Sequence, residues 1–137
     1  MPFDPKRDYP LGVKRPDLVT TQAGTRLAEV TLEALQAGRI EPAEIRATPA
    51  TLRLQAEVAR AAGRTALGEN LERAAELAAV PDELLLAAYT ALRPRRSSAA
   101  ELEQWAARLD ELGASKTAAF VREAAGVYAE RGLLAHG

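Results

Sequence analysis

Between Thr48 and Gly132 the sequence repeats one pattern, in which apolar residues three or four apart are bounded by residues that start or stop a helix. Apolar residues at this spacing lie on one face of an α-helix. Five long stretches of this kind follow one another, and no alternating strand pattern competes with them. The pattern therefore predicts an all-α fold, a small helical bundle whose antiparallel helices are joined by short loops.

The first two long helices have clear boundaries. Thr48 and Pro49 suit an N-cap and a first helical position, so the first helix is expected to run to Ala62 and stop at Gly63. The second is expected at about residues 65–79. Its apolar residues share one narrow face: Leu67, Leu71, Ala74, Ala75 and Ala78.

Three more long helices are expected, and each is bounded by residues typical of helix ends. The third begins at Pro81-Asp82 and is closed by Pro94. Ser98 with Glu101 forms a capping-box pattern for the fourth, which ends before Gly113. The fifth spans residues 115–131, and Gly132 follows it.

The N-terminal region differs, because prolines at positions 2, 5, 10 and 16 forbid a continuous helix. Residues 1–24 are therefore expected to form an extended arm, and residues 25–137 a single helical domain. A short helix is expected through Leu32 and Leu35 up to Gly38, and a brief turn at residues 41–45.

Alanine accounts for 30 of the 137 residues, so many inward positions hold small side chains. A buried alanine contributes less apolar area than a leucine, and the core is expected to be thin. We expect part of the stabilising area to lie against another chain. The 47% hydrophobic and 27% charged residues are ordinary for a soluble globular domain.

The residues that usually carry chemistry are scarce. The chain has no cysteine, its one histidine is the penultimate residue His136, and no phosphate-binding glycine motif occurs. Glu69, Glu72 and Glu76 are interpreted as a solvated helix face with Arg73 interleaved. The sequence therefore predicts no catalytic, cofactor-binding or metal-binding residue.

Charge and hydropathy exclude several partners and indicate a location. The net charge of −1 favours neither nucleic acid nor an anionic membrane as a partner. No apolar run of about 18 residues and no signal peptide occur, so a cytoplasmic protein is expected. The densest basic segment, Arg93-Pro94-Arg95-Arg96, suits contacts with a helix C-terminus, a subunit contact or a phosphate site.

Several ordered segments resemble one family, the small (gamma) subunits of adenosylcobalamin-dependent diol dehydratases and glycerol dehydratases. The resemblance runs almost from end to end. The matching blocks are Tyr9-Pro10-Leu11, Thr31-Leu32-Glu33, Arg46 to Ala56, Asn70 to Leu77, Val80-Pro81-Asp82, Tyr89 to Ser97 and Ala118 to Ala125.

The resemblance implies a noncatalytic subunit of a lyase that converts 1,2-diols to aldehydes by radical dehydration. It implies partners, namely a large TIM-barrel subunit, on which this chain packs, and a medium subunit, with two copies of each of the three chains. Adenosylcobalamin and a monovalent or divalent cation act in such a holoenzyme and are not bound by the small subunit alone. The preferred substrate, 1,2-propanediol or glycerol, stays open.

The sequence departs from the family pattern in two places. Only eight residues precede Tyr9, whereas diol dehydratase small subunits often carry a longer extension linked to bacterial microcompartments. This argues against encapsulation. Leu71 stands where phenylalanine is expected.

A subunit role predicts that Tyr9, Leu11, Tyr89, Leu92 and Arg93 contribute to subunit contacts. Aromatic residues and arginine dominate interface hot spots, and a proline-rich arm cannot fold on itself. Two alternatives are a free-standing helical interaction or regulatory module and a small independent enzyme. A free module would purify as a stable monomer or homodimer with salt-sensitive binding.

Overall fold

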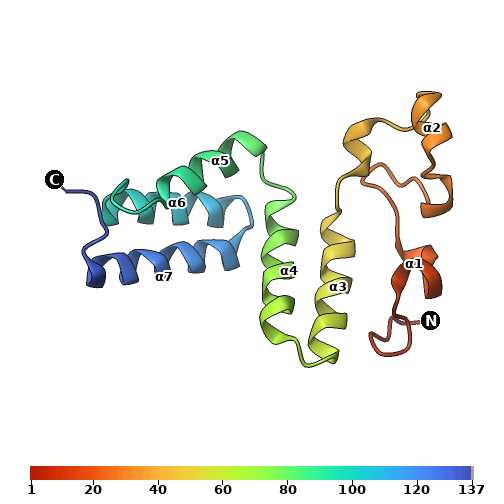
Figure 1. Ribbon diagram of the computed structural model, residues 1–137, viewed down its shortest axis with the longest axis horizontal. Coiled ribbons are helices and arrows are strands. Elements are labelled where there is room, and N and C mark those ends of the chain that lie inside the picture. Colours follow the sequence, from red (N-terminus) through yellow and green to blue (C-terminus); the bar gives the residue numbers. More distant parts are fainter. Residues whose placement is uncertain (137) are drawn as a thin grey trace. The chain divides into compact units, whose positions relative to one another are not determined.

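The computed structural model describes residues 1–136, and within them the fold is all-α (Figure 1). The short elements of the first half are α1 (Leu11–Lys14), η1 (Pro16–Leu18), η2 (Leu27–Glu29), α2 (Leu32–Gln36) and η3 (Pro42–Ile45). The longer helices are α3 (Pro49–Ala61), α4 (Thr65–Leu77), α5 (Asp82–Ala91), α6 (Ala99–Glu111) and α7 (Ser115–Arg131). The predicted helical order is confirmed.

The helix boundaries follow the predicted caps. Thr48 Oγ1 accepts a hydrogen bond from the Thr51 amide, and Pro49 is the first residue of α3. Ser98 and Glu101 form the capping box of α6. Gly132 follows α7 with a φ of 66°, a left-handed conformation that costs glycine little.

The chain divides into two compact units, which we call the N-terminal unit (Met1–Ala75) and the C-terminal unit (Glu76–Gly137). This boundary lies inside α4, and it differs from the expected boundary after residue 24. In each unit two long helices lie side by side, α3 with α4 and α6 with α7 (Figure 1).

The expected extended arm is interrupted by short helical turns. Residues 1–24 include α1 and η1, and Leu11 at the start of α1 is only 2% exposed. Proline prevents a long helix but tolerates a single turn, because its missing amide falls at the first helical position. Pro10 precedes α1 and Pro16 begins η1, as this rule requires.

The predicted apolar face of α4 is confirmed in part. Ala75 is buried and Leu71 and Ala74 are partly buried, as expected. Leu67 and Ala78 are exposed instead, and Gly68, which was not predicted, is buried. A Cβ atom added at Gly68 would lie 2.9 Å from Arg60 Cγ and 3.3 Å from the backbone oxygen of Ala56. Glycine therefore allows α3 and α4 to approach more closely than any other residue would, and this close approach sets the buried face.

The C-terminal unit has one continuous apolar core. Its buried members come from the segment before α5, from α6 and from α7: Val80, Leu102, Ala106, Leu109, Ala114, Ala118 and Val121. Partly buried leucines and Tyr128 pack around them. This cluster holds the α6–α7 pair together.

Candidate functional site

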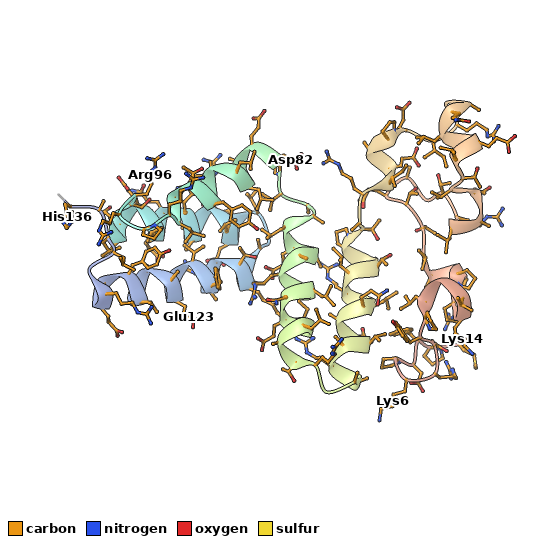
Figure 2. All side chains as sticks on the ribbon, in the orientation of Figure 1. Lys6, Lys14, Asp82, Arg96, Glu123 and His136 are labelled. Atoms are coloured by element: carbon orange, nitrogen blue, oxygen red, sulfur yellow. The ribbon has the colours of Figure 1, made fainter. Side chains whose placement is uncertain are left out.

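No grouping typical of a metal centre occurs within residues 1–136. No three histidine, cysteine, aspartate or glutamate side chains come together there in a way that could hold a metal ion. His136 is exposed next to the end of the chain (Figure 2). Within the same residues no helix is both long and apolar enough to cross a bilayer.

The glutamates of α4 have structural contacts that the interpretation as a solvated face missed. Glu76 is partly buried and accepts hydrogen bonds from the amides of Lys116 and Thr117, both at 3.0 Å, and from Thr117 Oγ1 at 3.1 Å. Ala114, the N-cap residue of α7, offers no side-chain cap. Glu76 therefore caps α7 from forty residues away, where a carboxylate also complements the helix dipole.

Glu72 is also partly buried, and its carboxylate pairs with the guanidinium of Arg60 on α3. This contact joins the two long helices of the N-terminal unit. Sequence spacing alone does not predict it, because the partners lie on different helices.

A buried carboxylate organises the N-terminal segment. Asp8, 4% exposed, accepts hydrogen bonds from the Asp4 amide at 2.9 Å, from Arg7 Nε at 2.7 Å and from Arg15 Nη1 at 3.2 Å. The Arg7 side chain first, and then the Asp4 amide, hold the pKa of Asp8 well below its usual range. A charged side chain with this many donors is satisfied, so Asp8 stabilises a loop rather than serving as a proton donor.

The predicted interface residues lie in different environments. Tyr9 and Tyr89 are 54% and 55% exposed, and Arg93 is exposed as well. Leu92 is partly buried against the core of the C-terminal unit. Leu11 belongs to the core of the N-terminal unit, so the chain's own packing uses its side chain.

Tyr9 lies at the edge of an apolar groove within the N-terminal unit. Val58 and Ala62 of the α3 end and Leu67 of α4 line the groove, and Lys6 and Arg64 add positive charge to it. Exposed apolar area of this kind is typical of a surface that another molecule covers.

Tyr89 lies on α5 beside a second exposed apolar residue, and a basic loop follows. Leu86 is 67% exposed, and the arginines Arg93, Arg95 and Arg96 are all exposed. Figure 2 shows Arg96 on the loop after α5 and Asp82 at the other end of that helix. The sequence found the basic residues, but not Leu86 as an exposed position.

Backbone contacts fix the conformation of this loop. The Tyr128 hydroxyl donates to the Leu92 carbonyl at 2.6 Å, and the Arg95 amide donates to the Leu133 carbonyl at 2.7 Å. Ser97 Oγ donates to the Ala91 carbonyl at 2.8 Å. The loop is thus tied both to the end of α5 and to the residues around the end of α7.

Comparison with known proteins supplies the family. The family model described as dehydratase small subunit matches residues 5–135. The propanediol dehydratase small subunit of Salmonella typhimurium is 50% identical over 125 residues, which cover 90% of this chain and 72% of that protein. The propanediol dehydratase small subunit of Citrobacter freundii is 50% identical over 125 residues, covering 90% of this chain and 73% of that protein.

The match extends over both units and includes the exposed surfaces described above. The chain's carboxylates Asp8 and Glu76 have structural contacts, and several apolar side chains are exposed, which is typical of a surface that another molecule covers. On the family match and the identity over nine-tenths of its length, the chain belongs to the dehydratase small-subunit family.

Proposed function

We propose that this chain is the small, noncatalytic subunit of a propanediol dehydratase, a lyase that converts 1,2-diols to aldehydes. The identity of 50% over 90% of the chain to two small subunits with that name carries the proposal. The small subunit stabilises the holoenzyme by packing on the large subunit, and glycerol is the alternative substrate.

The partners are a large TIM-barrel subunit and a medium subunit, with two copies of each of the three chains. Tyr9, Tyr89 and Arg93 contact these subunits directly through their exposed side chains. Leu92, partly buried at the edge of the core, contributes its remaining exposed area to the subunit contact. Leu11 is buried and supports the contact indirectly, by holding α1 in place. The complex works in the cytoplasm.

Adenosylcobalamin and an activating cation belong to the holoenzyme. Adenosylcobalamin supplies the radical that starts the dehydration. Within residues 1–136 no three metal-ligating side chains come together, which supports placing the cation on another subunit. We assign the chain no step of the reaction and place the cobalamin on the other subunits as well.

Co-purification tests the proposal. The tagged chain is expressed together with the genes beside its own, and the purified complex is assayed for aldehyde formation from 1,2-propanediol and from glycerol, with and without adenosylcobalamin. Two larger partners and cobalamin-dependent aldehyde formation are expected, and the two rates give the substrate preference. A well-folded chain that purifies alone would instead indicate a free-standing helical interaction or regulatory module.

A further inference from the structure

One face of α5 and the loop after it combine apolar and basic side chains. Leu86 and Tyr89 are three residues apart on α5 and share one side of that helix, and Arg93 lies in the loop just after its end. Leu86 and Tyr89 remain 67% and 55% exposed. We call these residues, together with Arg95 and Arg96, the α5 surface.

The α5 surface is held in one conformation before any partner arrives. Arg95 has a φ of 63°, a left-handed conformation that is unusual for a residue with a side chain. Its amide bond to the Leu133 carbonyl and the Tyr128 bond to the Leu92 carbonyl keep the loop in this geometry. A surface that is already ordered loses less conformational entropy on binding.

The three arginines of the α5 surface differ from many other cations of the chain. Arg7, Arg15 and Arg122 each pair with carboxylates nearby. No side chain within residues 1–136 forms an ion pair or hydrogen bond with the guanidinium groups of Arg93, Arg95 or Arg96. The N–H groups of these arginines can therefore donate to carboxylates of another molecule. A guanidinium group binds a carboxylate through two parallel hydrogen bonds, a bidentate geometry.

We propose that the α5 surface binds an apolar protein surface bordered by carboxylates on the large dehydratase subunit, an inference that rests on the proposed function. Leu86 and Tyr89 form the apolar centre, and the arginines pair with the carboxylates at its edge. Tyrosine and arginine are the residues that most often dominate such contacts. Two apolar side chains at the centre match a protein better than a phosphate backbone, whose recognition depends mainly on charge.

Reversal of the charge tests this inference in the assembled enzyme. The three chains are co-expressed with a tag on the large subunit, and the amount of small subunit that co-purifies with the large subunit is measured. We call this amount retention. The triple variant R93E/R95E/R96E is expected to lower retention about tenfold or more, because it places like charges against the partner's carboxylates. The matched control R53E/R108E/R131E changes the net charge equally at exposed arginines elsewhere and is expected to keep wild-type retention.

The apolar centre has its own test. Leu86→Ala is expected to lower retention, whereas Leu86→Met keeps the apolar contact and is expected to retain the subunit. Raising the salt from about 0.1 M to about 1 M shortens the Debye length from about 10 Å to about 3 Å, so wild-type retention is expected to fall. The Leu86→Ala defect is expected at both salt concentrations, since apolar contacts are not screened.

Several outcomes separate the failure of this inference from the failure of the proposed function. If the wild-type chain is not retained by larger subunits, the proposed function is wrong. If wild type and both triple variants are retained equally, only the α5 surface is wrong. Release by nuclease treatment, without an effect of charge reversal, would identify a nucleic acid and overturn the inference.

Folding is checked by far-UV circular dichroism, so that lost retention is assigned to lost binding. If the triple variant does not fold, the single substitution Arg96→Glu on the exposed loop replaces it in the same assay.

Discussion

The two units of this chain are stabilised in different ways. The C-terminal unit has a continuous apolar core in which Leu102, Leu109 and Val121 are almost fully buried. In the N-terminal unit the buried apolar side chains larger than alanine are Leu11 and Ile40, and polar contacts around Asp8 and Glu44 fix the loops. Large buried side chains stabilise a fold without specifying each loop, whereas hydrogen-bonded carboxylates specify loops and contribute little apolar area.

Glu44 illustrates the polar arrangement. Its Oε2 accepts hydrogen bonds from Thr21 Oγ1 at 3.1 Å and Thr25 Oγ1 at 3.0 Å. The Glu41 amide first, and then the Thr25 hydroxyl, lower the pKa of this carboxyl. One side chain thus connects η3 to a loop about twenty residues earlier, in a region with little apolar core of its own.

The largest expected effect concerns the core of the C-terminal unit. Leu102→Ala is expected to lower the free energy of unfolding by about 3 kcal/mol, because it leaves a cavity where Leu102 is 1% exposed. Trp105, the single tryptophan, lies one turn away on α6, so its fluorescence during urea unfolding reports the loss. Leu112→Ala, at a 40% exposed position, is the control and should cost less than about 1 kcal/mol.

The remote cap of α7 is the next largest contribution. Glu76→Ala is expected to lower the free energy of unfolding by about 1–2 kcal/mol, because it leaves the amides of Lys116 and Thr117 without their acceptor. Glu76→Gln keeps one carbonyl acceptor and is expected to cost less. The measurement is again the Trp105 urea midpoint. A loss no larger than that of Glu69→Ala, an exposed position on the same helix, would contradict the capping role.

Two helical glycines distinguish tight packing in the N-terminal unit from open surface in the C-terminal unit. Gly126→Ala is expected to raise the free energy of unfolding by about 1 kcal/mol, because alanine favours the helix and nothing lies within 4 Å of the added Cβ. Gly68→Ala is expected to give no gain or a loss, since Ala56 and Arg60 must move. Thermal unfolding of both variants measures the difference. An equal gain would show that α3 and α4 separate at no cost.

The smallest expected effect is a pH dependence confined to the N-terminal segment. The pKa of Asp8 is lowered in the folded chain, so its contribution is complete above the unfolded pKa of about 3.9 and is lost as the pH falls toward the folded value. The protection of amides in residues 1–17, measured as the exchange rate relative to that of an unfolded peptide at the same pH, is therefore expected to fall in acid. Asp8→Asn should remove this pH dependence and leave exchange faster at neutral pH.

A matched variant checks that result. Asp17 pairs with Arg15 and is exposed, so Asp17→Asn should change the exchange of the same peptides less than Asp8→Asn does. If the two variants change hydrogen exchange equally, the buried Asp8 stabilises the N-terminal segment no more than the exposed Asp17 does.

Much of the fold was predictable because helix ends depend on short-range chemistry. The Thr48 cap, the Ser98–Glu101 capping box and the glycine after α7 each act within a few residues of the helix that they bound. The sequence-based predictions placed these boundaries within a few residues. The family also followed from ordered blocks that extend through both units.

The candidate site was only partly predictable. Tyr89 and Arg93 were expected at an interface, and both are exposed. Leu11 was also expected at an interface, but the structure places its side chain in the core of the N-terminal unit. Whether an apolar side chain faces outward depends on which helix packs against it, and this is a long-range property. Leu67 of α4 was expected to face inward and is exposed for the same reason.

By itself, the sequence determined the all-α class, the helix boundaries and the family, since caps, periodicity and ordered blocks are local or linear features. Only the tertiary structure decided that Glu76 caps a helix forty residues away, that Asp8 is buried next to Arg7 and Arg15, and that Leu86 stays exposed on α5. The Glu76 contacts join residues distant in the chain, so they exist only after the helices have packed, and burial and exposure likewise depend on that packing.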